Sequence, residues 1–472
     1  MRSFSLMPPV LVTAVVAALA LAASPRSAQA QPAPPPGPAA AGLPSFDDAL
    51  AALLGRPGGL TADEAARRAL AASPAVQRKA AEVAAARTDT QTAKYALVPR
   101  TTVTAGYTRL SDVEYPELAP GFSFPVILNS FHLGAQVAVP VSDLLVRLPP
   151  LKRATEHGVA AAESGQRSAQ REAALEARLA YYEWVRAELQ VVVAERLLQQ
   201  VRANLGLVQA LAEVNRVSRA DVLRLEAQEA QVELALAQVR ELAGLRAEQV
   251  RIAIGAGAEE ALTIGEDVRE AAAAAAIPAA TELTRTALER REELKALRAA
   301  RAALEEQRRA ARIDRLPRLS VFAQAVYDNP NQRIIPAEDT FTFTWAAGAQ
   351  VSWSLNDFLD HGPGVDKLDA QLRALDADRA AFELGVRAQV TAARQAVVLA
   401  DAAQEATRRG LAAAEESHRV RQELLAAERA TAIELIDADT ELTRARIAVI
   451  DALIDRRLAR ARLAHVLGET TP

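Results

Sequence analysis

Apolar residues recur along much of this chain at the spacing of an α-helix. From Leu175 to Leu211 they cover 36 residues in ten steps, a mean spacing of 3.6 that places them on one helical face. We predict a long helix over 151–212 and a counterpart over 365–427, each roughly 90 Å long at about 1.5 Å per residue. Helices of this length do not form a globular core. They indicate coiled-coil-like walls in which Ala lets neighbouring helices approach closely.

A second pattern, alternation of apolar and polar residues, occupies residues 340–355. One face is apolar, with aromatic residues near both ends, and the other face is small and polar. The candidate lipid-facing residues are Phe341, Phe343, Trp345, Val351 and Trp353. A strand that crosses a bilayer has this distribution, with aromatic girdles at the interfaces and a wet interior. A soluble four-strand sandwich with one wet face is the alternative.

Weaker alternation over 101–110, 131–142 and 319–327 predicts three further strands. Four strands cannot close a membrane barrel, since the smallest natural ones have about eight. Open edges cannot face lipid, because their backbone groups would lack hydrogen-bond partners. If these strands span a membrane, several copies of the chain must therefore share one barrel.

The same order of elements occurs twice along the chain: helix, two strands, long helix, second helix. Matching anchors recur at offsets of 218, 214 and 213 residues, and they are Pro99 with Pro317, Gly134 with Gly348, and Gly255 with Gly468. Pro99 and Pro317 stop helices ahead of strands, and we expect them to redirect the chain there. Ser142 and Asp143 are interpreted as turn and cap residues before the first long helix.

This duplication sets the predicted domain boundaries. The first repeat covers 45–255 and the second 281–468, with an insert of unassigned role over 256–280 between them. Each repeat ends with a shorter helix, predicted over 218–254 and 431–467, and each of these helices is followed by a glycine.

The N-terminus predicts export. Residues 1–30 have a short positive start, an apolar run and an A-x-A cleavage signal at 28–30, which together indicate a signal peptide. The run is short for a spanning helix, although a retained anchor is the alternative. Residues 31–44 follow as a Pro/Ala-rich linker.

Composition narrows the function. Acidic and basic residues are interleaved with a net charge of −4, so nucleic acid is not an expected partner. The chain has no cysteine, which excludes disulfides and thiolate metal sites. Its five histidines are scattered without ligand spacing, and it has neither a phosphate-binding loop nor a nucleophile elbow. We expect no metal, no cofactor and no enzyme activity.

The duplicated order resembles the TolC-like outer-membrane efflux protein family over nearly all of the chain after residue 30. Two segments, 217–223 and 431–438, look like the hairpin tips of that family, and Pro99 and Pro317 resemble its helix-to-strand junctions. The resemblance implies a mainly α fold with a small β part. In it, duplicated helical hairpins form a periplasmic helical barrel, and four strands per chain contribute to a 12-strand transmembrane β-barrel in a homotrimer.

The same resemblance implies a function and partners. The chain would be the outer-membrane channel of a tripartite efflux or type I secretion system in a Gram-negative cell. It would work with a periplasmic adaptor (membrane fusion) protein and an inner-membrane pump, and it would contact outer-membrane lipid. The alternative is a periplasmic coiled-coil adaptor or scaffold protein.

The second tip carries two acids, Glu434 and Asp437, on one helical face. At a trimer axis they would form two rings of carboxylates that attract cations. Asp221 is the counterpart of Glu434 in the first tip, and we expect it to pair with Arg429 or Arg219. Asp221, Arg429, Glu434 and Asp437 are thus candidates for the periplasmic aperture. The alternative is that these are ordinary solvated acids at helix N-termini.

Overall fold

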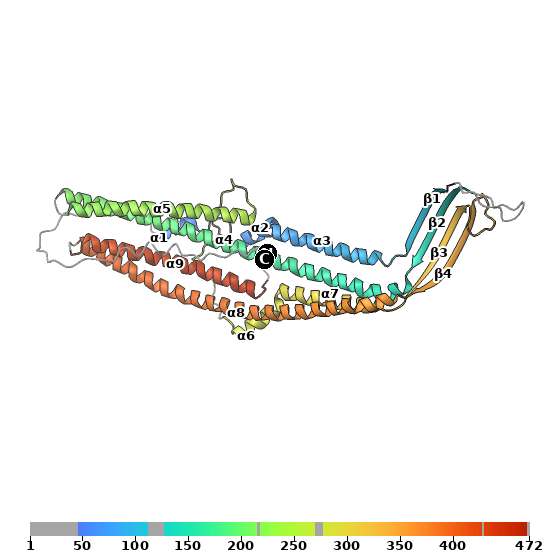
Figure 1. The fold of residues 1–472 in the computed structure, drawn as a ribbon. Coiled ribbons are helices and arrows are strands. Elements are labelled where there is room, and N and C mark those ends of the chain that lie inside the picture. The colour runs from blue at the N-terminus through green and yellow to red at the C-terminus, as the bar shows by residue number, and fades with distance from the viewer. Residues whose placement is uncertain (1–45, 112–126, 215–217, 270–276, 427–428, 470–472) are drawn as a thin grey trace.

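In the computed structural model the chain is an elongated molecule, with helices along most of its length and a four-stranded sheet at one end (Figure 1). The structure describes residues 46–111, 127–214, 218–269, 277–426 and 429–469, without the side chains of 46–47, 207, 211, 355–361, 425–426 and 432. The predicted signal peptide, the predicted linker and residues 270–276 of the insert lie outside these ranges.

The first half of the chain contributes three shorter helices and two long ones, and the second half contributes two of each. The first half has α1 (Phe46–Leu53), α2 (Ala62–Ala72), α3 (Pro74–Tyr95), α4 (Leu148–Glu213) and α5 (Arg219–Ile254). The second half has α6 (Ala280–Arg290), α7 (Glu292–Ile313), α8 (Leu355–Ala426) and α9 (Ala432–Val466). Helices α2 and α6 both have 11 residues, and α3 and α7 both have 22. These matched lengths favour the predicted duplication.

The second long helix begins earlier than the sequence predicts. We expected it from about residue 365. Instead α8 begins at Leu355 and continues through Pro363. The first long helix starts within a few residues of its predicted position. Its two prolines, Pro149 and Pro150, lie in its first turn, the part of an α-helix that tolerates proline best.

The sheet joins the two halves. Strands β1 (Arg100–Arg109), β2 (Asn129–Val139), β3 (Arg318–Asn329) and β4 (Thr342–Ser352) are antiparallel in the order β1-β2-β3-β4. The central pair, β2 with β3, therefore brings one strand from each half together. In the described part of the chain, the outer edges of β1 and β4 have no partner strand.

Short turns connect helices to strands at the base of the sheet. Pro99 and Pro317 each stand one residue before a strand, directly after the last turn of α3 or α7. The cap prediction for Ser142 was wrong. Its hydroxyl makes no helix-cap hydrogen bond; it accepts one from the Leu319 N–H at 3.1 Å and so ties the start of the long helix to β3. A π-helical turn, η1 (Asp143–Arg147), leads from there into α4.

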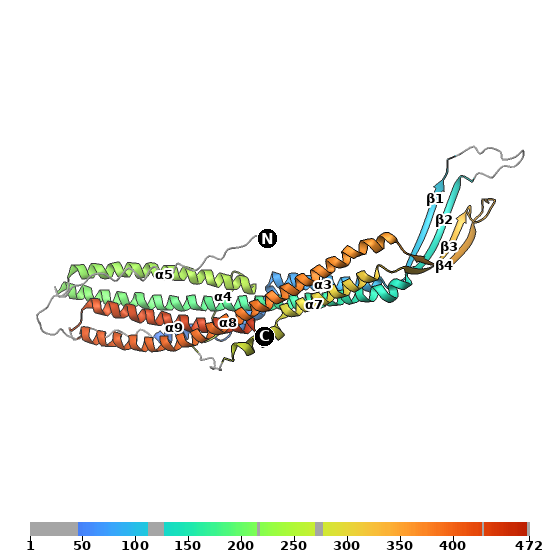
Figure 2. The same cartoon turned by 60° about the horizontal axis from the view of Figure 1, so that its bottom comes forward.

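Two antiparallel hairpins, α4–α5 and α8–α9, run side by side away from the sheet, and their tips form the far end of the molecule (Figures 1 and 2). Helix α4 is central, because it contacts α2, α3, α5, α7 and α9. The largest apolar cluster surrounds its middle, where Tyr181, Val185 and Leu189 are almost fully buried. A smaller cluster joins α6, α8 and the end of α9.

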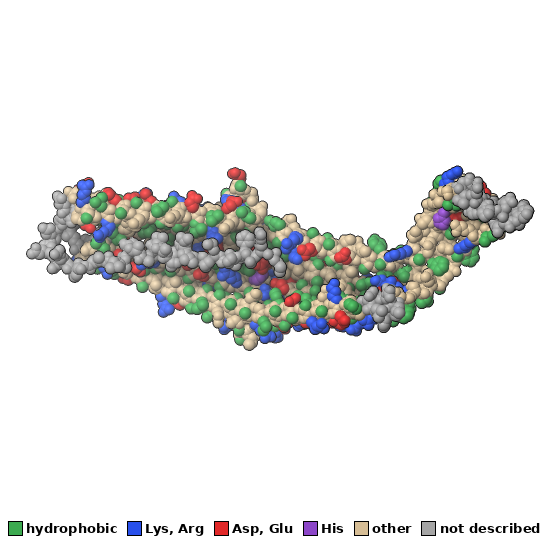
Figure 3. All heavy atoms as spheres, in the orientation of Figure 1, with side chains coloured by type: hydrophobic (Ala, Val, Ile, Leu, Met, Phe, Trp, Pro, Cys, Tyr) green, Lys and Arg blue, Asp and Glu red, His purple; other side chains and the backbone are tan. Residues whose placement is uncertain are grey.

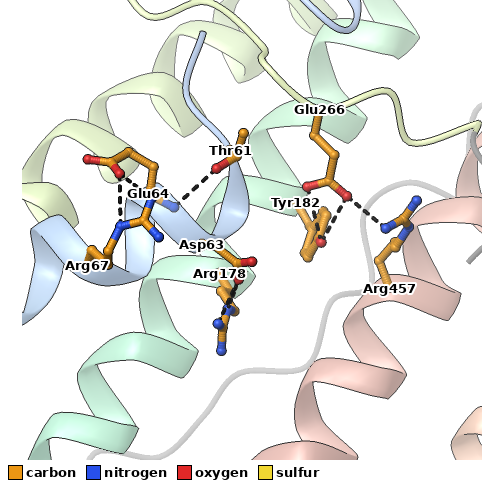
Figure 4. Close-up of polar contacts among 8 residues, drawn as sticks. All are labelled: Thr61, Asp63, Glu64, Arg67, Arg178, Tyr182, Glu266 and Arg457. Atoms are coloured by element: carbon orange, nitrogen blue, oxygen red, sulfur yellow. Dashed lines mark hydrogen bonds and ion pairs between the residues drawn. The ribbon is translucent and has the colours of Figure 1, made fainter. Parts of the chain in front are cut away.

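The insert between the repeats, residues 256–280, contacts several helices around the middle of α4. Leu60 and Ile264 form a parallel β-bridge, and a Cβ on Gly59 would lie only 2.6 Å from the Gly265 nitrogen. Glu266 then accepts a hydrogen bond from the Tyr182 hydroxyl at 3.3 Å and pairs with Arg457 of α9 at 2.8 Å (Figure 4). Burial raises the pKa of Tyr182, so this hydroxyl remains a donor. The described part of the insert thus connects α2, α4 and α9.

The same close-up shows how α2 is fixed to α4. Thr61 caps α2 by accepting a hydrogen bond from the Glu64 N–H at 3.2 Å, and Asp63 in its first turn pairs with Arg178 of α4 at 2.7 Å (Figure 4).

Among the described helices, none is both long and apolar enough to cross a membrane.

Candidate functional site

The strand register separates the sheet into two chemically different faces. One row across the sheet contains Val103, Ala135, Ala325 and Trp345, and odd-numbered residues of all four strands share its face. Its apolar members are Val103, Ala105, Tyr107, Phe131, Leu133, Ala135, Val137, Val139, Leu319, Val321, Ala323, Ala325, Tyr327, Phe343, Trp345, Ala347, Ala349 and Val351. Four polar residues at strand ends share this face, which we call the apolar face: Thr101, Arg109, Asn129 and Asn329. Few charged side chains appear on the sheet, whereas they are spread over the helices (Figure 3).

The apolar face is exposed in the single chain. Trp345 is 69% exposed and Val351 is 67% exposed. Burying a side chain such as Val stabilises a protein by about 1.5–3 kcal/mol, so this exposure is unfavourable in water. At the end far from the helices, Phe341 lies 5.2 Å from Tyr327 and 5.8 Å from Phe131, measured between ring centroids. At the helical end, Trp353 donates its indole N–H to the Arg315 carbonyl at 3.3 Å. The five candidate lipid-facing residues therefore extend from one end of β4 to the other.

The opposite face is polar, and it contains a group that the alternation did not single out. His132 contacts Asp328 at 2.7 Å through Nδ1 and Thr104 at 3.2 Å through Nε2. These residues come from three adjacent strands, so only the register of the sheet reveals that they meet.

At both hairpin tips, a hydroxyl side chain caps the N-terminus of the second helix. Ser218 accepts a hydrogen bond from the Asp221 N–H, and Thr431 accepts one from the Glu434 N–H, both at 3.3 Å. These contacts satisfy backbone donors at the start of α5 and α9. Behind the caps, Leu205, Val208 and Leu225 form a small buried cluster, against which Ile436 of α9 packs.

The candidate aperture residues have different partners from those expected. Within the described residues, Asp221 is bonded to Ser218, at 2.6 Å, rather than to Arg219 or Arg429. Glu434 instead pairs across its own hairpin with Arg421 at 2.7 Å, and both side chains are more than 40% exposed. Asp437 and Arg429 are exposed near the tip. In the described part of the chain, no group of three or more His, Asp and Glu side chains is placed to hold a metal ion.

Comparison with known proteins shows what the second half of the chain is similar to. Residues 283–469 match the family model described as outer membrane efflux protein. The match covers 187 of the 472 residues. The predicted resemblance to TolC-like channels is confirmed by this match together with the solved structures of similar fold. No curated protein matches the chain by sequence.

The efflux-protein fold extends over the first half as well. CusC superposes with a TM-score of 0.75 at 14% identity, covering 94% of this chain and 99% of its own. The outer-membrane channel OprN superposes with a TM-score of 0.72 at 19% identity, over 90% of this chain and 92% of its own. The open state of the Neisseria gonorrhoeae MtrE outer membrane channel gives 0.72 at 17% identity, over 86% and 89%. At these identities the likeness concerns the fold: long helical hairpins with a small sheet.

Proposed function

We propose that three copies of this chain assemble into an outer-membrane channel, the outlet of a tripartite efflux or type I secretion system. The single observation that supports this most strongly is the sheet. It has one aromatic and apolar face, one polar face, both largely exposed in the single chain, and two outer edges without a partner strand in the described residues. A membrane barrel needs an apolar outside, a polar lumen and closed edges.

The proposed copy number follows from the strand number and the family resemblance. Three chains with four strands each give twelve strands, which exceeds the minimum of about eight for a natural membrane barrel. In such a barrel, β1 of one copy pairs with β4 of the next. Strands of 10 to 12 residues match the 9–11 or so that a tilted strand needs to cross a bilayer. We therefore assign Phe341, Phe343, Trp345, Val351 and Trp353 to lipid contact.

The helices also carry surface that a neighbouring copy would cover. On α5, the exposed apolar residues Leu223, Leu234, Leu245 and Ile252 are spaced by 11, 11 and 7 residues, which keeps them on one side of the helix. On α8, Leu384, Val398, Leu399 and Val420 are also exposed. Contact between these two surfaces of adjacent copies would extend the barrel into a helical conduit. The far end of that conduit would meet a periplasmic adaptor protein and an inner-membrane pump.

Cross-linking tests the assembly. The chain has no cysteine, so every disulfide would come from introduced residues. We would combine Thr102→Cys on β1 with Ala346→Cys, Gly348→Cys or Gln350→Cys on β4, because the register between copies is open. Within one chain β1 and β4 are three strand spacings apart, about 14 Å, which is too far for a disulfide.

We expect at least one pair to give disulfide-linked products of two and three chains, and none larger. The same protein should fractionate with the outer membrane and conduct ions in a planar bilayer. A freely water-soluble monomer without cross-links would contradict the channel and favour the adaptor or scaffold alternative.

The aperture proposal has its own test. In the trimer, Glu434 and Asp437 would place six carboxylates around the axis and bind divalent cations. Block of the conductance by Mg²⁺ should weaken roughly tenfold in the Glu434→Ala, Asp437→Ala double variant. The control double variant, Glu405→Ala with Glu416→Ala, removes the same number of acidic groups from α8, away from the tip. It should leave the block unchanged. Equal block in both double variants would refute the acidic rings.

A further inference from the structure

The hydrogen-bond pattern of the sheet shows which backbone groups lie on its open edges. In an antiparallel ladder, residues that exchange both backbone hydrogen bonds with their partner alternate with residues whose N–H and C=O groups point away from it. The Leu110 N–H donates to the Leu128 carbonyl at 2.7 Å, which continues the β1–β2 register. Even-numbered residues of β1 therefore bond to β2, and the N–H and C=O groups of its odd-numbered residues point toward the open edge.

The same alternation extends to β4, which lies at the other margin of the sheet (Figure 2). The registers are continuous, so odd-numbered residues of β2 bond to β3, and even-numbered residues of β3 bond to β4. The odd-numbered residues of β4 then have their N–H and C=O groups on the open edge, and their side chains belong to the apolar face. A β1 strand from another copy would extend both the ladder and the apolar face if odd-numbered residues oppose one another.

One acceptor on the open edge of β4 is already occupied. Trp345 is odd-numbered, so its carbonyl points away from β3, and the Arg333 side chain donates to it from Nη1 at 3.1 Å. The turn after β3 positions this arginine. The Arg333 backbone N–H donates to Asn331 Oδ1 at 3.0 Å, and the Asn331 side-chain amide donates to the Thr342 carbonyl at 3.1 Å. Asn331 is 3% exposed, so the turn that holds Arg333 is anchored in the protein.

This edge is a hazard in a chain that has not assembled. Phe343, Trp345 and Val351 of β4 are each more than 60% exposed, and an open edge beside such an apolar face is a template on which strands of other chains can pair. Natural sheets protect open edges with charged side chains. A strand that pairs at Trp345 must first break the Arg333 contact and leave the arginine without that acceptor.

We propose that Arg333 protects the open edge of β4 in the unassembled chain and is displaced when β1 of a neighbouring copy pairs there. Its contact with Trp345 makes pairing by any strand less favourable, so that only a strand which continues the whole edge replaces it. The protection is a property of the single chain. Displacement by a neighbouring copy rests on the proposed channel function.

Aggregation of the full chain tests the protection without requiring a channel. The chain is unfolded in urea and diluted into buffer without detergent, while light scattering and thioflavin T fluorescence are recorded. Arg333→Ala should aggregate roughly fivefold faster than the wild type, the change expected for the loss of about one hydrogen bond. The matched control Arg109→Ala removes a cation from the same end of the sheet that donates to the Asn129 side chain instead of an edge carbonyl. It should aggregate at the wild-type rate.

A further variant shows whether the additional aggregation uses this edge. Ala347 is odd-numbered, so its N–H lies on the open edge, and Ala347→Pro removes this donor without breaking the β3–β4 ladder. Combined with Arg333→Ala, it should return the rate to the wild-type value. Equal rates for the wild type and Arg333→Ala would overturn the protection. An increase that survives Ala347→Pro, or that Arg109→Ala shares, would overturn it as well.

The disulfide cross-linking described above separates the two proposals. If β1 of a neighbour replaces Arg333, the yield of linked trimers and their melting temperature should be the same in Arg333→Ala as in the wild type; a lower melting temperature would refute the displacement. Faster aggregation of Arg333→Ala with no trimer in any variant supports the protection and refutes the channel. Trimers without a difference in aggregation do the reverse.

Discussion

The long helices α4 and α8 occupy corresponding places in the two repeats but have different surroundings. Helix α4 is covered on most sides, and none of its described large apolar side chains is exposed. Helix α8 contacts mainly α9, α7 and α6, and it exposes Leu384, Val398, Leu399 and Val420. Duplication has therefore preserved the order of the elements but not their packing. One long helix forms the centre of the single chain, and the other leaves apolar side chains exposed.

The largest effect should come from placing a charge on the exposed surface of α8. Leu399 is 69% exposed in the single chain, yet the proposed trimer covers it. Leu399→Glu should reduce the trimer fraction in chemical cross-linking at least tenfold, because burying an unpaired charge costs several kcal/mol. Each chain should still fold, with unchanged helical circular dichroism.

Helix α8 supplies a matched control for this variant. Arg408 lies nine residues after Leu399, which at 100° per residue places it on the opposite side of the helix, and it is exposed. Arg408→Glu should leave the trimer intact. If both variants assemble as the wild type does, the apolar surface of α8 is not an interface, and the contrast with α4 has no functional meaning.

A smaller effect should distinguish the cores beside the two helices. Val185 of α4 and Val390 of α8 are both fully buried, the first in the large central cluster and the second in the small one. Val185→Ala should cost about 3 kcal/mol and Val390→Ala about 1.5. The loss of two carbons accounts for about 0.8 kcal/mol each, and the better-enclosed site adds a larger cavity penalty. Thermal unfolding followed by helical circular dichroism measures both; equal losses would show that α4 is not the better-packed helix.

The sequence predicted the main elements because each depends on local pattern. The helical period of α4 and the alternation of β4 are properties of consecutive residues, and repeated prolines and glycines placed the junctions. The start of α8 was missed: Gly362, Pro363 and Gly364 have low helix propensity, yet the helix continues through them. Local propensity is a weak guide where packing against neighbouring elements decides.

The polar contacts were much harder to predict. Asp439 looks like one more acid in an acid-rich helix, and only the assembled hairpins bring it to Gln200, Asn204 and His418. Likewise, His132 and Asp328 meet through the β2–β3 register. Most of these contacts join residues 196 to 239 positions apart, and no spacing rule within a single sequence reports them.

The smallest expected effect concerns a second histidine that the repeats do not share. His465 of α9 corresponds to Ile252 of α5, which is exposed, whereas the His465 side chain is 14% exposed and lies 3.2 Å from Glu172 of α4. Burial lowers the pKa of His465, and this outweighs the opposing attraction of Glu172. The unfolded chain therefore binds a proton at a higher pH than the folded chain does. Stability should be unaffected above about pH 6.5 and should fall as the pH drops below that value.

We expect the melting temperature of the wild type to fall by about 1–2 °C between pH 7 and pH 5.5 more than that of His465→Gln. The variant removes the group that titrates but keeps a polar side chain of similar size. A wild type that becomes more stable in acid relative to His465→Gln would mean that Glu172, and not burial, controls this histidine. In that case the charge of Glu172, rather than burial, would be what distinguishes the surroundings of His465 from those of its counterpart Ile252.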